Sequence, residues 1–172
     1  MTPEITILIA DDHPVFRHGL RQVIENAVGL RVVAEAENGA VALRLLQEKR
    51  PQVAVLDVDM PEVDGFEVVR TARRQQIEVE VVFLTMHKDA DVLNEALSLG
   101  VRGFIVKDSA VNDITDSIRA VAAGQFFISS AMSGLLVRRN AAARALSGER
   151  PGLKILTPTE LRVLQLDRKS VV

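Results

Sequence analysis

The sequence predicts an α/β fold: a doubly wound, five-stranded parallel sheet with helices on both faces. Two observations support this prediction. Short apolar runs alternate five times with longer stretches of helical periodicity, as in parallel strands joined by crossover helices. The apolar runs are also nearly continuous, which is typical of strands that are covered on both sides. A chain of 172 residues has room for one such domain and a further fragment.

The predicted strands are the apolar runs that are rich in Val, Ile and Leu. They span residues 5–10, 31–36, 52–57, 80–85 and 103–107. The stretches between and after them have the period of a helix. The predicted helices span residues 14–29, 39–50, 66–75, 89–99 and 111–123.

The first predicted helix has the clearest boundaries. Pro14 suits the first helical turn and Gly29 suits a stop. Six apolar side chains are predicted to share its buried face, namely Val15, Phe16, Leu20, Val23, Ile24 and Ala27.

After Gly124 the alternation of strands and helices ends. Residues 138–152 are rich in Arg and Ala and then contain Ser-Gly and Pro-Gly, which indicates a linker with a helical part. We therefore predict a first domain over residues 1–126, a linker over 127–155 and the start of a second unit over 156–172.

The second unit opens with LTPTELRVLQL (156–166). Thr157 is a good helix N-cap, Pro158 suits the first turn and Glu160 completes a capping box. These residues predict the start of a helix.

Charge is divided unevenly along the chain. Residues 1–130 hold 13 Lys and Arg against 20 Asp and Glu, whereas residues 131–172 hold 8 against 3. The basic tail indicates a second functional part or, equally, a solvated Arg-rich linker.

The chain has no cysteine, which excludes disulfides and thiolate metal sites and agrees with a reducing cytoplasm. It also lacks an apolar run of membrane-spanning length, so we expect no membrane contact.

Polar side chains follow four of the five predicted strands. Asp11 and Asp12 follow the first, Asp57 ends the third, Thr85 ends the fourth and Lys107 ends the fifth. The carboxyl ends of parallel strands meet at one edge of the sheet, where ligands bind. Three carboxylates would repel one another there unless a divalent cation neutralised them. Oxygen ligands favour Mg²⁺, Mn²⁺ or Ca²⁺, and Mg²⁺ commonly binds one or two carboxylates together with phosphate oxygens.

This set of side chains suits phosphoryl chemistry. The Lys107 ammonium can hold phosphate oxygens, and the Thr85 hydroxyl can bond a phosphoryl oxygen. An aspartate beside a metal ion can act as a nucleophile and become an aspartyl phosphate, and Asp57 is placed to do so. Taken singly, a strand-end Asp is more often a cap and a lysine a surface charge, so the joint pattern carries the prediction.

Four motifs resemble those of two-component response regulators of the NarL/FixJ (LuxR-type) subfamily. They are ADDHPVFRHGL (10–20), LDVDMPEVDGFEV (56–68), FLTMH (83–87) and GFIVKDS (103–109). The resemblance implies a flavodoxin-like receiver domain with strand order 2-1-3-4-5. It also implies a phosphoacceptor in a phosphorelay rather than an enzyme. Its partners would be a sensor histidine kinase and, after phosphorylation, a second copy of the chain, and its output would be control of transcription.

The resemblance assigns roles to individual carboxylates. Asp57 would accept the phosphoryl group. Asp12 would bind Mg²⁺ directly, Asp11 directly or through water, and the backbone carbonyl of Asp59 would be a further ligand.

The resemblance also implies which residues would respond to phosphorylation. Lys107 would hold the phosphoryl oxygens, Thr85 would move toward the phosphoryl group and Phe104 would turn inward behind it. Met86 departs from the family pattern, which has a small residue there, so a bulky side chain could narrow access to Asp57.

Three histidines stand near these motifs. His87 and Asp59 occupy positions that tune the lifetime of the phosphoryl group in this family. Without cysteine, the scattered histidines argue against a transition-metal site, so His13 is expected to shape the loop before Pro14.

The segment LTPTELRVLQL resembles the opening of a LuxR-type helix-turn-helix domain. The residues after it, DRKSVV (167–172), do not supply a recognition helix. We therefore expect promoter DNA binding of a full-length parent protein but not of residues 1–172 alone.

Two other functions remain open. The chain could be a stand-alone receiver that acts through protein contacts. The DVD sequence (57–59) also resembles the Asp-x-Asp motif of haloacid-dehalogenase-type phosphatases, although that motif normally follows the first strand.

Overall fold

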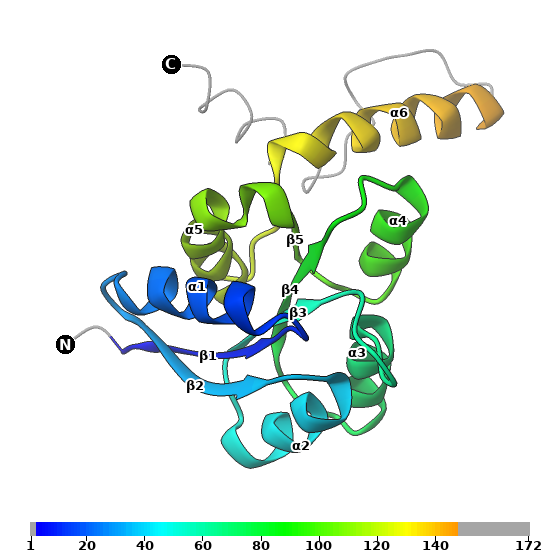
Figure 1. Cartoon of the computed structure of the whole chain (residues 1–172). Helices are drawn as coiled ribbons and strands as arrows, with labels where there is room; N and C mark the ends of the chain where they lie inside the picture. Colours follow the sequence, from blue (N-terminus) through cyan, green and yellow to red (C-terminus); the bar gives the residue numbers. More distant parts are fainter. Residues whose placement is uncertain (1–2, 148–172) are drawn as a thin grey trace.

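Figure 1 shows the computed structural model of the chain, which describes residues 3–147. It contains one parallel sheet with the order β2-β1-β3-β4-β5-β6. The strands are β1 (Ile5–Ala10), β2 (Leu30–Ala36), β3 (Val53–Asp57), β4 (Glu80–Thr85), β5 (Gly103–Val106) and β6 (Phe127–Ile128). The helices are α1 (Pro14–Glu25), α2 (Gly39–Lys49), α3 (Gly65–Arg74), α4 (Ala90–Ser98), α5 (Ala110–Ala122) and α6 (Ser130–Ser147), with a 3₁₀ turn, η1 (Lys107–Ser109), before α5.

The predicted fold class and the order of the first five strands are confirmed. The number of strands is not, because the sheet has six. After α5 the chain turns at Gly124, whose φ is +73°. It then runs beside β5, where Phe127 N donates to Arg102 O (2.8 Å) and Ser129 N to Phe104 O (3.0 Å). Part of the predicted linker therefore belongs to the sheet.

The buried face of α1 differs from the prediction at one position. Leu20 and Ile24 are buried and Phe16 is partly buried, as expected, but Val15 is 88% exposed. Five residues separate Val15 from Leu20, which is about 140° around a helix of 3.6 residues per turn. Val15 therefore points away from the sheet.

Helices cover both faces of the sheet (Figure 1). We call the face toward α1 and α5 the aliphatic face, because its buried hydrophobic side chains are all aliphatic. They are Ile7, Ile9, Leu20, Ile24, Leu30, Val32, Val53, Val55, Val82, Leu84, Ile105, Ala110, Ile114, Ile118 and Val121.

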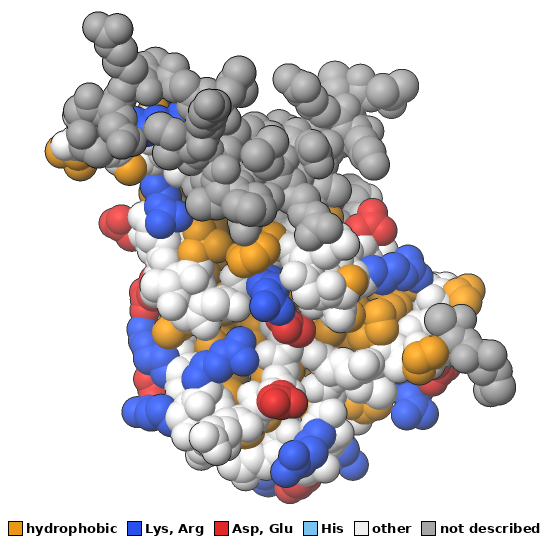
Figure 2. Space-filling view, turned by 180° about the vertical axis from the view of Figure 1, so that it is seen from behind, with side chains coloured by type: hydrophobic (Ala, Val, Ile, Leu, Met, Phe, Trp, Pro, Cys, Tyr) orange, Lys and Arg blue, Asp and Glu red, His pale blue; other side chains and the backbone are white. Residues whose placement is uncertain are grey.

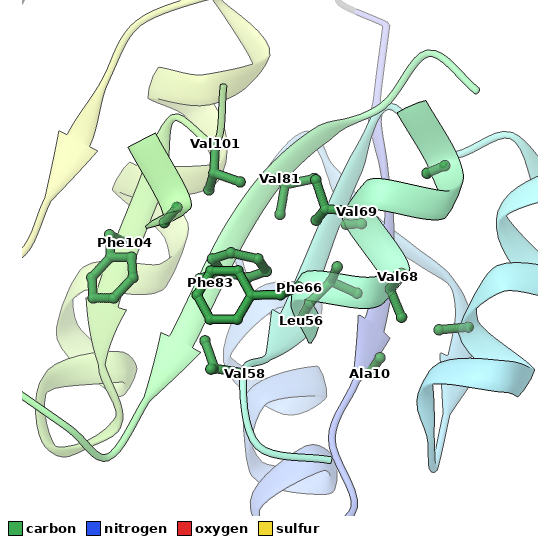
Figure 3. Close-up of a cluster of buried hydrophobic side chains, with 14 of the residues drawn as sticks. Ala10, Leu56, Val58, Phe66, Val68, Val69, Val81, Phe83, Val101 and Phe104 are labelled. Atoms are coloured by element: carbon green, nitrogen blue, oxygen red, sulfur yellow. The ribbon is translucent and has the colours of Figure 1, made fainter. Parts of the chain in front are cut away.

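We call the opposite face, toward α2, α3, α4 and α6, the aromatic face, because it buries three phenylalanines (Figure 3). Phe66 and Phe83 meet edge to face with ring centroids 5.0 Å apart, and Phe83 and Phe104 do so at 6.5 Å. Successive residues of a strand point to opposite faces, so Phe83 lies on this face and Leu84 on the other.

The start of α6 packs on the aromatic face. Met132 is fully buried and Leu136 is 6% exposed, and both belong to the same cluster as Phe104. Ser129, just before α6, is also buried and accepts a hydrogen bond at its Oγ from Val106 N (3.4 Å). The chain is thereby held to β5 at two points on either side of Ile105.

The surface carries both signs of charge. Lys and Arg side chains are interspersed with Asp and Glu side chains on the face shown in Figure 2. None of the helices described is long and apolar enough to cross a membrane. The predicted helix start at Thr157, Pro158 and Glu160 lies outside the residues that the structure describes.

Candidate functional site

The predicted polar side chains meet beyond the carboxyl ends of β1, β3 and β5. The strand order reverses between β1 and β3, because β2 lies on one side of β1 and β3 on the other. Loops at such a point diverge and leave a crevice, which is where open α/β sheets bind ligands. Asp11 follows β1, Asp57 ends β3 and Lys107 follows β5.

Lys107 joins the two buried carboxylates. Its Nζ lies 2.8 Å from Asp57 Oδ2 and 2.8 Å from Asp11 Oδ2. The Lys107 side chain is 8% exposed and those of Asp11 and Asp57 are 0% and 2% exposed. A buried ammonium between two buried carboxylates is a strongly coupled charge cluster, because little water screens it.

Backbone groups fix the position of Asp57. Its Oδ1 accepts a hydrogen bond from Asp59 N (3.1 Å). Gly65 packs against the peptide of Asp57, since a Cβ at residue 65 would lie 2.5 Å from Asp57 O. Gly65 N also donates to Val58 O (3.0 Å). Gly65 therefore shapes the site through the close approach of its backbone to Asp57.

The loop after β1 is held by three bonds. Asp11 Oδ1 accepts a hydrogen bond from the backbone N–H of His13 (2.8 Å). Arg17 Nη1 donates to Asp11 O (2.6 Å), and Arg17 Nε contacts Glu35 Oε2 (3.4 Å). Arg17 was not predicted as a site residue, because its role depends on a carbonyl six residues earlier in the chain.

The acidic cluster fits a hard divalent cation. Asp11, Asp12, His13 and Asp57 each offer a ligand atom, and these atoms lie within 4.8 Å of one another. Asp11 Oδ2 and Asp12 Oδ1 are buried oxygens of this cluster, and Lys107 Nζ lies 2.8 Å from the first of them. A group of carboxylate oxygens this close together is suited to Mg²⁺ or Mn²⁺. The His13 imidazole lies at the rim, with Nδ1 2.8 Å from Asp12 Oδ1.

Burial has the largest influence on the pKa of Asp57. It raises the pKa of Asp57 from 3.8 to about 6, although the hydrogen bond from Lys107 acts in the opposite direction and Asp11 adds repulsion. Burial also tends to lower the pKa of Lys107, but its hydrogen bonds to Asp11 and Asp57 outweigh this effect and the pKa is raised. The single ammonium therefore compensates the charge of Asp57 only in part.

The predicted switch residues lie on neighbouring strands behind the cluster. Thr85 ends β4, is fully buried and accepts a hydrogen bond at Oγ1 from His87 N (3.0 Å). Phe104 is 2% exposed and packs on the aromatic face (Figure 3). The structure thus brings Asp11, Asp57 and Lys107 into contact and places Thr85 and Phe104 nearby without showing their roles.

An open hollow of about 530 Å³ lies beside Lys107. Its lining consists of His13, Val15, Phe16, Met86, Lys107 and Asp108. Met86 is 61% exposed, so its side chain stands at the edge of this hollow. His87, the residue after Met86, has its Nε2 3.4 Å from Asp59 Oδ2.

Comparisons with known proteins point to one family. Residues 7–119 match the response regulator receiver domain. Over 142 residues the chain is 32% identical to the transcriptional regulatory protein NarL of Mycobacterium tuberculosis (strain H37Rv), covering 81% of this chain and 66% of that protein. It is 32% identical over 161 residues to the nitrate/nitrite response regulator protein NarL of Escherichia coli (strain K12), covering 94% and 74%. The chain thus spans about two thirds of the mycobacterial relative's length.

Solved structures agree with these matches. The signal receiver domain of NarL from Mycobacterium tuberculosis has a TM-score of 0.69 at 32% identity, covering 72% of this chain and 99% of that one. A LuxR-family two-component response regulator from Aurantimonas has a TM-score of 0.76 at 30% identity, covering 80% and 99%.

Proposed function

This chain belongs to the response regulator receiver domain family, and from that premise we propose that it accepts a phosphoryl group on Asp57 from a histidine kinase. The contact of Lys107 with Asp57 and Asp11 is the observation that supports this proposal most directly. A lysine with two buried carboxylates has no stabilising advantage over an apolar core, so the cluster is better explained by chemistry than by stability.

The transfer follows from the positions of these side chains. One Asp57 oxygen attacks the phosphorus atom of a phosphohistidine, the new P–O bond forms as the P–N bond breaks, and the leaving imidazole takes up a proton. Lys107 exchanges its contact with the Asp57 carboxylate for one with a phosphoryl oxygen. Asp59 N, which now donates to Asp57 Oδ1, holds the acceptor in place.

Asp11, Asp12 and Asp57, with the backbone carbonyl of Asp59, would hold Mg²⁺ or Mn²⁺. The ion supplies positive charge that offsets the negative charge of the transferring group. The clustering of their ligand atoms, which lie with one from His13 within 4.8 Å of one another, supports the assignment of the three carboxylates.

The response would be a shift between two conformations. The phosphoryl group adds charge and acceptor oxygens at the end of β3, and contacts with Thr85 and Lys107 would favour one conformation. Phe104 would transmit the change to the surface, and two phosphorylated chains would associate. The names of the NarL relatives support control of transcription as the output, with promoter DNA as the partner of a full-length protein.

Labelling with a small phosphodonor tests the acceptor. The chain is incubated with Mg²⁺ and acetyl phosphate, and intact mass and peptide mapping follow. We expect one phosphoryl group on Asp57 and none in Asp57→Asn. Asp116→Asn, an exposed aspartate on α5, is the matched control and should be labelled as the wild type is. Equal labelling of Asp57→Asn would refute the assignment.

Asp12→Ala separates metal binding from phosphoryl acceptance. Calorimetric titration with Mg²⁺ should show a sharp loss of affinity in this variant. Lys107→Ala should retain most of the affinity but lose phosphorylation-driven association. Unchanged association in Lys107→Ala would contradict the role of this lysine.

A further inference from the structure

The Lys107 ammonium has a third neighbour besides the two carboxylates. Its Nζ lies 4.9 Å from the centroid of the Phe16 ring, over the face of that ring. The face of an aromatic ring carries negative potential and attracts a cation, more strongly when water is excluded. Lys107 is 8% exposed, so the contact lies in the stronger range.

The open hollow explains why a third neighbour matters. A lysine ammonium sits on a flexible four-carbon stem and can adopt several positions. The hollow lies directly beside Lys107 and is lined by Phe16 and by Asp108, an exposed carboxylate that could attract the ammonium outward. Phe16 forms part of the wall of this hollow, and its ring face gives the ammonium a contact in addition to the two carboxylates.

Phe16 is itself fixed to the site. It lies in the first turn of α1, is partly buried and packs against the aliphatic face. The same turn is tied to the loop of Asp11 through Arg17 Nη1 and Asp11 O. The ring and the Asp11 carboxylate therefore belong to one short segment, residues 11–17, and both contact the same ammonium.

From this geometry we propose that Phe16 is a positioning residue: its ring holds the Lys107 ammonium beside Asp57. The inference rests on the proposed function, because its consequence is faster phosphoryl acceptance. During transfer Lys107 must leave the Asp57 carboxylate and follow the phosphoryl oxygens, and the ring limits how far it can move.

The contact can be tested without phosphorylation. The chain has only five lysines, so selective ¹³C-lysine labelling of the full chain gives a simple NMR spectrum. We expect the εCH₂ protons of Lys107, assigned with Lys107→Arg, to be shifted upfield by the ring. Phe16→Leu should abolish this shift, whereas Phe16→Tyr should retain it. An unchanged resonance in Phe16→Leu would overturn the proposal.

The role is tested by the initial rate of labelling with acetyl phosphate and Mg²⁺. Phe16→Leu keeps an apolar side chain but removes the ring face, and should lower the rate about three- to tenfold. Phe16→Tyr should restore it. Phe127→Leu is the matched control, because Phe127 also packs partly buried on the aliphatic face but pairs with Gly103 at the far end of β5.

A second background separates positioning from a general structural role. In Lys107→Met, the further change Phe16→Leu should have no effect on the remaining rate, because there is no ammonium to position. The same fold loss in both backgrounds would overturn the proposal. A normal labelling rate of Phe16→Leu would also overturn the proposed role of Phe16. The proposed function would not be affected by that result. No labelling of the wild type would overturn the proposed function and the role of Phe16 with it, even if NMR showed the ring contact.

Discussion

The aliphatic face and the aromatic face of the sheet bury different kinds of side chain and are completed by different parts of the chain. The aliphatic face is closed by α1 and α5, and its buried hydrophobic side chains are all aliphatic, although α5 also buries Ser117. The aromatic face buries Phe66, Phe83 and Phe104 (Figure 3), and its outer end is covered by Met132 and Leu136 of α6.

The family match makes this difference informative. It covers residues 7–119, which include nearly all the buried residues of the aliphatic face but neither Met132 nor Leu136. The buried residues of one face thus lie within the matched region except for Val121, whereas the other face also depends on Met132 and Leu136, which follow that region. Phe104, the predicted switch residue, lies on the face that is completed from outside.

The largest expected change in stability tests how far the aromatic face depends on α6. Met132→Ala removes a fully buried side chain and should lower the free energy of unfolding by about 2–5 kcal/mol. Urea denaturation followed by circular dichroism measures it. Val137→Ala, at a site 53% exposed on the same helix, should cost less than about 0.5 kcal/mol.

Met132→Ala also tests whether the aromatic face and the aliphatic face respond separately. Methyl NMR signals of Leu93 and Val106 on the aromatic face should shift in Met132→Ala, and those of Ile114 and Ile118 should not. Equal shifts on both faces would show that the two layers do not respond separately.

The next expected effect is an increase in the free energy of unfolding. It concerns Asp57, at the edge of the sheet where both faces end. Burial raises the pKa of Asp57 to about 6 from 3.8, so the folded chain binds this proton more tightly than the unfolded chain. The carboxyl group therefore contributes stability below pH 4 that is lost as the pH rises through 6. Asp57→Asn should raise the free energy of unfolding at pH 7 by up to about 3 kcal/mol.

Denaturation between pH 4 and pH 7 with EDTA measures this gain, which should shrink toward zero at the lower pH. EDTA is needed because a bound cation would also stabilise the carboxylate. Asp116→Asn should show no comparable dependence. A destabilised Asp57→Asn at pH 7 would mean that the ion pairs with Lys107 outweigh the cost of burial.

A smaller effect tests the aromatic packing itself. Phe66 and Phe83 meet at 5.0 Å with an interplanar angle of 68°. A double-mutant cycle with Phe66→Leu and Phe83→Leu should give a coupling of about 0.5–1.5 kcal/mol. A parallel cycle on the aliphatic face, with Ile114→Val and Ile118→Val, should give less than about 0.5 kcal/mol. Equal couplings would remove the distinction between the faces.

The smallest effect lies on the surface of the aromatic side. Arg70 pairs with Glu95 and lies 5.9 Å from the Phe66 ring, but both charged side chains are more than 40% exposed. Arg70→Met should therefore cost less than about 1 kcal/mol, and the loss should diminish with added salt. Arg44→Met, in a more exposed pair on α2, is the control. A loss that salt does not change would assign the effect to packing on Phe66.

Most of the fold could be predicted because its strands are buried on both sides. The predicted boundaries of β1 and β4 match the structure, and the others differ by one residue. The sixth strand could not be predicted, because two residues carry no periodicity and Phe127 pairs through its backbone. Val15 was misplaced because apolar character alone does not give the angle of a side chain around a helix.

The site was predictable where a residue's role follows from its place at a strand end. Asp11, Asp57 and Lys107 meet as expected, because parallel strands end at a common edge. Arg17 and the Phe16 ring were missed as site residues, because their contacts depend on how α1 leans against the loop after β1.

The attachment of α6 to β5 has a practical consequence for protein engineering. A chimaera that joins this receiver to another effector would commonly be cut near the end of α5. Such a cut would remove β6, expose the backbone edge of β5 to other chains, and uncover the apolar surface beneath Met132 and Leu136. The junction should lie after Leu136, so that the residues of α6 that pack on the sheet remain part of the receiver domain.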